Sequence, residues 1–525
     1  MNIADENLPL QRILHWEQAR AHHVYLTQPM GGAVRDYTWS QTVGEARRVA
    51  AWLKAEGVKR GWPERACIGI LSKNCAHWIM CDFAIWMAGY VSVPLYPTLT
   101  AQSVRQILEH SEAKALFVGK LDDWPAMKSG VPDDVLCFSC PLSPPNDFAK
   151  WDDIIKTAPL APVPLRDGDD LATIVYTSGT TGMPKGVMHK FKTFALVAEV
   201  GGEIWHATPD DRVLSHLPLA HVAERLGVES ASLAYGFRVF FAESLETFAR
   251  DLRTARPTKF GTVPRLWAKF QQGVFSKMPQ RRLDRLLKIP LVRGIVRKKI
   301  LDGLGMDQVQ SSYVGAAPMP PAMLEWYRRL GLNISEVYGM TENFAISHGT
   351  RPGQGRIGYV GTPYDEVECK LSEIGEVLVK SPGNMIGYYK EPEKTREALS
   401  EDGWLKTGDL GAFDEQGRLR ITGRAKELFK TSKGKYVAPA PIENKLSAGT
   451  GIDAVCVAGA NYGQPCALAM LSPDAAKLDR ATLTRSLGEH LAAVNATLDP
   501  HEQLDFLALV KDPWNIENGF ITPTL

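Results

Sequence analysis

The sequence predicts an α/β protein with more than one domain. Its 525 residues are too many for one simple domain. Its content of 45% hydrophobic and 23% charged residues is ordinary for a soluble globular protein with a large core. A buried strand at 66–71, an apolar helix at 77–89 and a further strand that begins at Tyr90 follow one another. Strand–helix–strand alternation of this kind predicts a parallel sheet covered by helices.

The other elements are placed by periodicity and by breaker residues. Residues 34–39 alternate like a strand, and residues 42–57 carry apolar side chains at helical spacing before a glycine cap. Residues 133–164 are rich in Pro and Asp, so we expect a loop-rich connection there. Near the C-terminus, a short strand at 454–458 and a helix at 480–496 indicate a compact α+β module.

The charge balance and the cysteines argue against several functional classes. Lys and Arg together number 60 against 59 Asp and Glu, and a net charge of +1 argues against a general nucleic-acid binder. The N-terminal residues include acidic side chains and no long apolar stretch, which argues against a signal peptide. The most apolar run, 78–94, is interrupted by Asp82. Cys137 and Cys140 form a lone CxxC pair, so we interpret them as strand residues of a reduced, cytoplasmic protein.

A small polar loop before Lys185 is the strongest functional signal. An apolar run that ends at Tyr176 predicts a strand, and Lys185 follows the loop on a turn fixed by Pro184. Glycines let backbone N–H groups approach a ligand, and hydroxyls and a lysine bind phosphate oxygens, so the pattern predicts a phosphate-binding loop. It is not a Walker A loop, because Pro184 and Gly186 flank the lysine. The alternative is an ordinary surface loop between two strands. The loop residues are Thr177, Ser178, Gly179, Thr180, Thr181 and Gly182.

Two further strand ends, separated by a predicted helix at 321–330, indicate a nucleotide site. Ligands of open α/β sheets bind at the carboxyl ends of strands. Small residues after the first strand leave room for a flat ring, on which Tyr338 of the second strand can stack. Glu342 follows that strand, and a carboxylate suits Mg²⁺, which prefers oxygen ligands; the alternative is an exposed Thr-Glu pair. The small and neighbouring residues are Gly315, Ala316, Ala317, Gly339 and Thr341.

Three more residues are candidates because of their positions in turns. Asp409 follows a turn glycine, where its carboxylate can accept hydrogen bonds from both hydroxyls of a ribose. Arg424 ends a predicted hairpin strand at 417–424. His221 is presented by a turn after an apolar strand, although a lone histidine is more often a structural residue.

Residues 281–299 combine basic and apolar side chains. Eight Lys or Arg stand against Asp284 alone, with Leu, Ile and Val between them and a break at Pro290. One interpretation is a basic amphipathic surface in weak peripheral contact with anionic lipid at the inner face of a membrane. The other, which we favour, is a solvated pair of helices whose apolar side packs on the core.

Several of these stretches carry motifs of one known family. The residues from Tyr176 to Gly186 resemble the signature of the adenylate-forming enzymes, which include acyl-CoA synthetases, peptide-synthetase adenylation domains and luciferases. Later segments match further motifs of that family in the family's order, and the resemblance runs from about Tyr37 to the last residue. The sequence near the hinge and at 518–525 is most similar to long-chain acyl-CoA synthetases. The matching segments are 217–221, 338–342, 403–410 and 423–430.

The resemblance implies a fold in two domains. Residues 1–423 would form a large N-terminal domain of helix-flanked β-sheets with a small β-barrel subdomain. Residues 424–525 would form a small, mobile α+β lid domain with its hinge at Lys426. Lys430 would lie on the lid face that turns to the active site in the second half-reaction.

The resemblance also implies a two-step reaction that uses ATP, Mg²⁺ and CoA. A fatty, long-chain carboxylate attacks the α-phosphorus of ATP to give acyl-AMP and pyrophosphate, and the thiol of CoA then displaces AMP. Glu342 would hold Mg²⁺, His221 would border the acyl pocket, and Asp409 and Arg424 would bind ribose or phosphate. The implied catalytic residues are Thr181, Lys185, His221, Glu342 and Lys430.

Alternatives remain open at this point. The chain could load a carrier protein, act as an adenylating oxidase, or bind adenylate or acyl-CoA without catalysis. The family's last motif, aligned on 522–525, places its catalytic lysine directly after Leu525. Either this sequence is a shortened form or the protein lacks that lysine, and we expect a chain that ends at Leu525 to adenylate poorly. The length of the acyl chain and the oligomeric state, monomer or homodimer, are not encoded in motifs.

Overall fold

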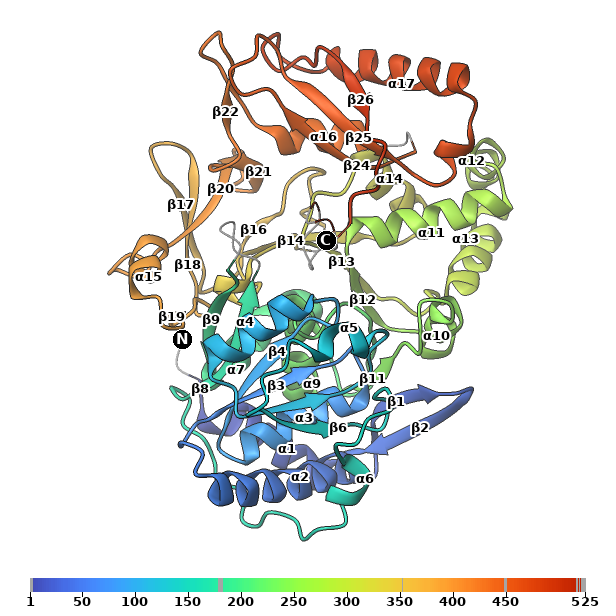
Figure 1. Cartoon of the computed structure of the whole chain (residues 1–525). Helices are drawn as coiled ribbons and strands as arrows, with labels where there is room; N and C mark the ends of the chain where they lie inside the picture. The colour runs from blue at the N-terminus through green and yellow to red at the C-terminus, as the bar shows by residue number, and fades with distance from the viewer. Residues whose placement is uncertain are drawn as a thin grey trace.

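The computed structural model describes residues 3–177, 183–351, 353–447, 451–515, 518 and 520. The predicted loop residues 178–182 and the predicted final motif at 522–525 lie outside the described residues. Figure 1 shows a large body of several sheets and helices with a smaller C-terminal part, drawn in red, beside it. The predicted mixed α/β fold is confirmed.

The largest sheet has eight strands in the order β19-β9-β8-β4-β3-β5-β6-β7. All neighbours from β8 to β7 pair in parallel, whereas β9 is antiparallel to β8, and β19 is antiparallel to β9. The predicted parallel sheet is therefore confirmed, with an antiparallel edge added. Its strands are β3 (Cys67–Leu71), β4 (Val91–Leu95), β5 (Ala115–Val118), β6 (Leu136–Ser139), β7 (Ala149–Lys150), β8 (Leu171–Thr177), β9 (Lys185–Lys190) and β19 (Gly387–Tyr388).

Helices cover both faces of this sheet (Figure 1). Side chains of the strands alternate between two cores: Ile70 and Phe117 belong to one, and Leu71 and Leu116 belong to the other. The first core includes α1 (Pro9–Ala19), α2 (Trp39–Arg60), α3 (Ala76–Met87) and α7 (Phe191–Trp205), and the second includes α4 (Ala101–Ser111) and α5 (Trp124–Lys128).

Helix α2 is longer than the predicted segment 42–57. It begins after Thr38, whose side chain accepts a hydrogen bond from the backbone of Gln41, while the Gln41 side chain accepts one from the backbone of Thr38. It ends at Gly61, which has a left-handed φ of 67°. Gly57 is a packing residue, because a Cβ there would lie 1.9 Å from the Tyr90 hydroxyl oxygen. The prediction mistook this packing glycine for a helix cap.

Two smaller sheets and a group of helices also belong to the large part. The parallel strands β12, β13 and β14 place their carboxyl ends side by side, and β15 and β16 extend that sheet in antiparallel fashion. The helices predicted at 281–299 and 321–330 are confirmed. The strands of the first sheet are β10 (Arg212–Ser215), β11 (Arg238–Phe241), β1 (Val24–Met30) and β2 (Ala33–Thr38). The strands of the second sheet are β12 (Lys259–Thr262), β13 (Ser311–Val314), β14 (Ile334–Tyr338), β15 (His348–Gly349) and β16 (Thr362–Pro363). The helices around the third core are α10 (Phe248–Ala255), α11 (Pro264–Lys277), α12 (Gln280–Lys288), α13 (Pro290–Leu304) and α14 (Pro321–Leu330).

The expected small β-barrel corresponds in the structure to an antiparallel sheet of four strands in the order β17-β18-β20-β21. Leu419 of β21 also makes two backbone hydrogen bonds of 2.8 Å to Val360 and Gly361, just before β16, so the pairing continues beyond this sheet. The sheet packs its apolar face on the main core, and a closed barrel stays a prediction. The strands are β17 (Glu368–Leu371), β18 (Glu376–Lys380), β20 (Leu405–Phe413) and β21 (Leu419–Arg424).

The C-terminal part is an α+β module with its own core, as predicted. The helix predicted at 480–496 is α17 (Arg480–Asn495), and the strand predicted at 454–458 lies within β24 (Ile452–Ala458). An ion pair joins Arg265 of α11 to Asp453 of β24 at 3.2 Å. The boundary at residue 423 and the hinge at Lys426 stay predictions. The other elements are β22 (Phe429–Lys430), β23 (Tyr436–Val437), α16 (Pro439–Ser447), β25 (Cys466–Leu471) and β26 (Leu507–Leu509).

Candidate active site

The strand pair β8–β9 holds the residues on either side of the predicted phosphate loop. Thr177 ends β8 and lies opposite Lys185, the first residue of β9. Tyr176 lies opposite Gly186, where a Cβ would come within 2.8 Å of Ile174 Cγ2. The antiparallel register therefore fixes Lys185 beside Thr177. The predicted contributions of Ser178, Gly179, Thr180, Thr181 and Gly182 lie outside the described residues.

One aromatic residue links Lys185 to Glu342. Lys185 Nζ lies 4.7 Å from the centre of the Tyr388 ring, and the Tyr388 hydroxyl donates to Glu342 Oε1 at 2.8 Å. Burial and the neighbouring Glu342 carboxylate raise the pKa of Tyr388, so its hydroxyl stays a donor. Tyr388 lies in β19, opposite Val187 of β9. Sequence reasoning gave Tyr388 no role in the site, because an aromatic residue next to a glycine in a short strand looks structural.

A tight turn after β14 positions Glu342. A Cβ at Gly339 would lie 2.3 Å from the carbonyl carbon of Ala345, so only glycine fits this close approach. The buried His189 donates through Nε2 to the carbonyl oxygen of Thr341 at 2.8 Å. Burial lowers the pKa of His189 to about 3, which keeps the ring neutral. The Glu342 backbone also accepts a hydrogen bond from Met385 N at 2.7 Å, so the turn is held from several sides.

Glu342 suits a Mg²⁺ ion whose other ligands come mainly from the phosphates of a bound substrate. Among the described residues there is no group of three or more His, Cys, Asp or Glu side chains that could hold a metal ion. Mg²⁺ is commonly bound by one or two carboxylates together with substrate phosphates and water. Among the described residues, the recorded side-chain hydrogen bond to the Glu342 carboxylate reaches Oε1, and a carboxylate has further acceptor sites for a cation. The residues therefore fit a magnesium–phosphate site, and they do not form a metal cage of protein ligands alone.

A second group of contacts joins Tyr338, Asp409 and Arg424. The Tyr338 hydroxyl donates to Asp409 Oδ2 at 2.7 Å, and Arg424 Nε lies 3.0 Å from Asp409 Oδ1. Asp409 and Arg424 are register partners in β20 and β21, and Asp409 is buried whereas Arg424 is exposed. A carboxylate has about four lone-pair sites, so Asp409 can accept further hydrogen bonds from hydroxyls. Burial and the Asp409 charge raise the pKa of Tyr338.

The small residues after β13 lie at the same sheet edge as Tyr338. Ala316 and Ala317 are exposed, and Ala316 has a left-handed φ of 65°. A Cβ at Gly315 would lie 3.1 Å from Val337 Cγ2 of the neighbouring strand. Because β13 and β14 run in parallel, this open edge lies beside the start of the turn that carries Glu342.

His221 is fixed as the N-cap of a short helix, α8 (Val222–Glu224). Its Nδ1 accepts a hydrogen bond from Ala223 N at 3.1 Å, and burial lowers its pKa, so the ring is neutral with its proton on Nε2. Glu224 braces the preceding turn by accepting hydrogen bonds from Ser215 Oγ and His216 N, both at 2.8 Å. No recorded contact of the described residues joins His221 to Lys185, Glu342 or Asp409.

A buried charge cluster lies one helical turn beyond His221, and the sequence analysis missed it. Arg225, Asp82 and Glu229 are fully buried and form ion pairs, with Arg225 Nε 2.8 Å from Glu229 Oε2. Arg225 Nη1 also donates to Thr173 Oγ1 of β8 at 2.8 Å. Asp82, which interrupts an apolar run in the sequence, is therefore the partner of Arg225. The available signal was the pair of charges at 225 and 229, spaced by one helical turn.

The predicted hinge and lid residues are exposed. Lys426 and Lys430 lie at the surface, and Lys430 Nζ is 5.5 Å from the centre of the Tyr436 ring. Among the described residues, no recorded contact joins Lys430 to Glu342 or Asp409. Their predicted roles remain predictions.

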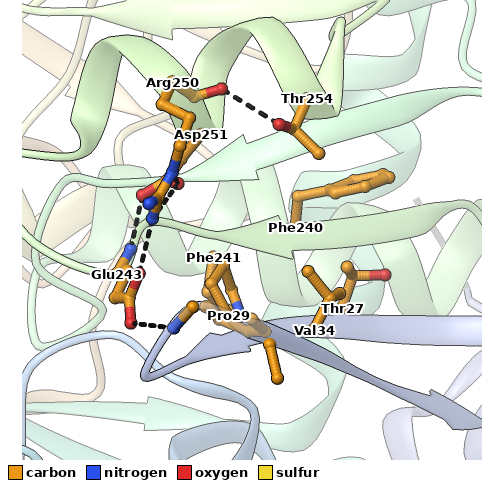
Figure 2. A pocket seen from close by; sticks show the side chains of 11 residues that line it. Thr27, Pro29, Val34, Phe240, Phe241, Glu243, Arg250, Asp251 and Thr254 are labelled. Carbon is orange, nitrogen blue, oxygen red and sulfur yellow. Dashed lines mark hydrogen bonds and ion pairs between the residues drawn. The ribbon is translucent and has the colours of Figure 1, made fainter.

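A separate pocket of about 190 Å³ lies between the β1–β2 hairpin and α10 (Figure 2). It contains none of the predicted site residues. Arg250 bridges Glu243 and Asp251, and Asp251 also accepts from the backbone of Glu243 at 2.8 Å. Because these charges satisfy one another, we interpret the pocket as a structural hollow.

Comparison with known proteins gives a family match over most of the chain. The AMP-binding enzyme family matches residues 15–389, and the AMP-binding enzyme C-terminal domain matches residues 427–513. Long chain acyl-CoA synthetase 6, peroxisomal, of Arabidopsis thaliana is 30% identical over 94% of this chain and 80% of its own length. Long-chain-fatty-acid–CoA ligase 1 of Homo sapiens is 30% identical over 87% of this chain and 75% of its own.

The overall fold also occurs in solved structures. The o-succinylbenzoate coenzyme A synthetase of Bacillus subtilis in complex with AMP superimposes with a TM-score of 0.75 at 22% identity, over 97% of this chain and 96% of that one. At this identity the likeness supports the fold. The family match and the curated relatives carry the classification: the chain belongs to the AMP-binding, adenylate-forming enzyme family and is an AMP-forming acid–thiol ligase of the acyl-CoA synthetase group.

Proposed function

We propose that this chain activates a fatty carboxylic acid with ATP and then joins it to CoA. In the first step, a carboxylate oxygen of the acid bonds to the α-phosphorus of ATP and pyrophosphate leaves, which gives acyl-AMP. In the second step, the CoA sulfur bonds to the acyl carbon and loses its proton, and AMP leaves. The observation that carries the proposal is the chain of contacts from Lys185 through Tyr388 to Glu342.

Two groups of contacts meet at the end of β14, which supports a single reaction centre. β14 supplies Tyr338 to the Asp409 group, and the turn that follows it supplies Glu342 to the Lys185 group. The first group offers hydrogen-bond acceptors suited to ribose hydroxyls. The second offers a cation and a carboxylate suited to phosphates with their metal ion. This pairing of chemistries fits a nucleoside triphosphate.

Fixed charges make the first step feasible. An anionic carboxylate must approach an anionic triphosphate, and the Coulomb repulsion between them opposes the reaction. Lys185 would neutralise part of the leaving pyrophosphate charge from a position already set by the β8–β9 register. The hydroxyls and backbone groups of residues 177–182 would bind the same phosphates, with Thr181 as a catalytic member. Positioning and electrostatics then supply most of the rate enhancement.

Glu342 would hold Mg²⁺ together with phosphate oxygens. When bound, the metal would draw negative charge from the phosphates. Tyr388 orients the carboxylate by donating to one oxygen, and its ring keeps Lys185 close to the carboxylate. The Tyr338–Asp409–Arg424 group would orient the ribose, and the open edge at 315–317 would accommodate the flat ring of adenine.

His221 would border the acyl group, and the lid would serve the second step. The neutral His221 ring adds no charge beside an apolar chain, and its Nε2–H can donate to a carboxyl or acyl oxygen. We assign residues 1–423 to the large domain and 424–525 to the lid, with rotation about Lys426 bringing Lys430 toward the acyl-AMP for thioester formation. The relatives named as long-chain enzymes support a fatty acid as the substrate.

Two assays with a panel of acids test the proposal. ATP–pyrophosphate exchange should depend on a fatty acid and on Mg²⁺, and mass spectrometry should detect acyl-CoA when CoA is added. The Asp409→Ala variant should lose nucleotide affinity by roughly 1.5–3 kcal/mol if charge-assisted hydrogen bonds are lost. Exchange without thioester formation, together with transfer to a holo carrier protein, would instead identify a carrier-loading ligase. Absence of acid-dependent exchange for every acid would contradict an adenylating role.

A further inference from the structure

The helix pair α12–α13 presents two different faces. Leu283 and Leu287 of α12 are buried in the third core, as the sequence analysis favoured. One side of α13 packs on the same core. These packed residues of α13 are Val296, Ile300, Leu301 and Leu304.

The outward side of α13 carries aliphatic side chains that are exposed and do not belong to the core. Leu291 is 89% exposed and Ile295 is 70% exposed. They are spaced by one helical turn and therefore lie on one face, turned away from the packed side chains of the same helix. Ile289, the residue between the two helices, is also 46% exposed. Adjacent exposed aliphatic side chains on one helix face are typical of an interaction surface.

Exposed basic side chains accompany these aliphatic residues on α13 and on the neighbouring helix α12. Lys298 and Lys299 follow Ile295 by about one turn, so they flank the exposed pair. On α12, Arg281, Arg285 and Lys288 recur at the spacing of one helix face, and all three are exposed.

Most of these cations have no recorded ion pair among the described residues. The carboxylate of Asp284 pairs with Arg329 at 2.8 Å, and Arg297 donates to the Arg329 carbonyl at 2.6 Å. Within the described part of the chain, no ion pair is recorded for the remaining basic residues of the two helices, so their charges are available to an anionic partner. These residues are Arg281, Arg282, Arg285, Lys288, Arg293, Lys298 and Lys299.

We propose that the outward face of α12–α13 docks on the surface of an anionic lipid bilayer. The lysines and arginines would meet lipid phosphates, and Leu291 and Ile295 would enter the boundary between headgroups and acyl chains. An anionic bilayer offers both a negative surface and an apolar layer, whereas a nucleic acid offers phosphates without an apolar layer at the same depth. No helix among the described residues is long and apolar enough to cross a membrane, so the contact is peripheral. The proposal is independent of the reaction, because it concerns the protein without ATP or CoA.

Vesicle co-sedimentation of the whole chain tests this docking face. We expect binding to vesicles of phosphatidylcholine mixed with phosphatidylglycerol, and little binding to phosphatidylcholine alone. Raising the salt from 0.1 M to 1 M shortens the Debye length from about 10 Å to about 3 Å and should release the protein. Lys298→Glu with Lys299→Glu should weaken binding by at least about tenfold, because each lysine near the surface attracts anionic lipid and each glutamate repels it.

Matched variants separate this face from general surface effects. Leu291→Ser with Ile295→Ser should weaken binding by about tenfold. Ile374→Ser should not, because Ile374 is 72% exposed in the turn between β17 and β18, and these two strands lie far from α13 in Figure 1. Arg480→Glu with Arg485→Glu, on exposed positions of α17, makes the same change in net charge as the lysine pair and should leave most of the binding intact. Unchanged melting temperatures would show that the surface changes leave the fold intact.

Four results would overturn the proposal. They are equal binding to neutral vesicles, binding that survives high salt, equal losses in the test and control variants, and binding to duplex DNA in place of vesicles. A blue shift of the new tryptophan in Ile295→Trp upon addition of anionic vesicles would support insertion at this position. An unchanged emission spectrum would contradict it.

Discussion

At the scale of single residues, the candidate site depends on Tyr388. This side chain contacts Lys185 through its ring and Glu342 through its hydroxyl, so one residue sets the distance between a cation and a carboxylate. Without the ring between them, the two charges could pair directly and neither would be free for phosphate or metal. The arrangement therefore keeps opposite charges close and still available for ligands.

The Lys185→Ala variant should have a raised KM for ATP or a lowered kcat, with an unchanged preference among acids. The reason is that Lys185 lies beside Thr177 at the predicted phosphate loop. Loss of a preorganised charge typically costs about 10²–10³ in rate. Steady-state kinetics with several acids check this prediction. Lys190→Ala is the matched control, because Lys190 ends the same strand and pairs with Asp169 at 2.7 Å. A changed acid preference with normal ATP kinetics would refute the assignment.

The Glu342→Gln variant should require more Mg²⁺ for half-maximal activity, because an amide oxygen binds a hard cation more weakly than a carboxylate does. A magnesium titration of the rate measures the effect, and activity should disappear in both proteins when a chelator removes the metal. Glu325→Gln is the matched control, because it makes the same change at a carboxylate of α14 that pairs with Arg328 at 3.3 Å and lies outside the site. A wild-type titration curve for Glu342→Gln would argue against a metal-binding role.

At the scale of elements, the turn between β10 and α8 is held by a buried carboxyl group. Glu224 accepts hydrogen bonds from Ser215 and His216, and burial raises its pKa to about 8. The ordinary pKa of a glutamate is 4.5. Between pH 4.5 and about pH 8, the folded state therefore keeps a proton on Glu224 that the unfolded state releases. The contribution of Glu224 to stability is therefore complete below about pH 4.5 and decreases as the pH rises toward 8.

The Glu224→Gln variant should lose this part of the pH dependence. The free energy of unfolding of the wild type, relative to the variant, should fall by up to about 1.4 kcal/mol per pH unit within that window. Urea denaturation at several pH values measures the difference. The exposed Glu325→Gln on α14 is the control, and it should give no such slope. Parallel stability curves for the wild type and Glu224→Gln would show that Glu224 has an ordinary pKa.

Sequence reasoning identified elements wherever the signal was local. Helix α14 has its predicted bounds, and α17 ends one residue before its predicted end. Both predictions used an apolar face and end signals, which depend on residues close together in the sequence. Gly57 misled the prediction of α2, since packing against Tyr90 is not visible in a local pattern. Strand pairing between distant segments, such as β1 with β11, is likewise not visible in a local pattern.

The candidate site divides in the same way. Motif residues such as Lys185, Glu342 and Asp409 could be selected from short patterns. The Tyr388–Glu342 hydrogen bond spans 46 residues and the Arg225–Asp82 pair spans 143, and no local pattern encodes such contacts. The structure adds these contacts between residues that are distant in the sequence.

At the scale of the whole molecule, the two proposed half-reactions would use one centre. The Arg265–Asp453 ion pair joins the large part to the C-terminal module at 3.2 Å. Both side chains are partly exposed, so such a pair contributes only about 0.2–1 kcal/mol. That range would bias the position of the proposed lid by a small factor without locking it.

Charge reversal tests this bias. Arg265→Glu or Asp453→Arg alone should change the ratio of adenylation to thioester formation by up to about fivefold, and the double reversal should restore it. The two half-reactions are measured separately, as pyrophosphate exchange and as thioester formation from supplied acyl-AMP. Arg328→Glu on α14, which breaks an exposed pair with Glu325, is the control. A ratio unaffected by either single change would mean that the pair does not influence the lid.

The most direct test of the central claim follows the oxygen atoms of the acid. Direct attack of the carboxylate on the α-phosphorus moves one carboxyl oxygen into AMP when the thioester forms. With a fatty acid labelled by ¹⁸O in its carboxyl group, together with ATP, Mg²⁺ and CoA, mass spectrometry should therefore find one ¹⁸O atom in each AMP and none in pyrophosphate. Label in inorganic phosphate with ADP as the product, or AMP formation independent of the acid, would contradict the account.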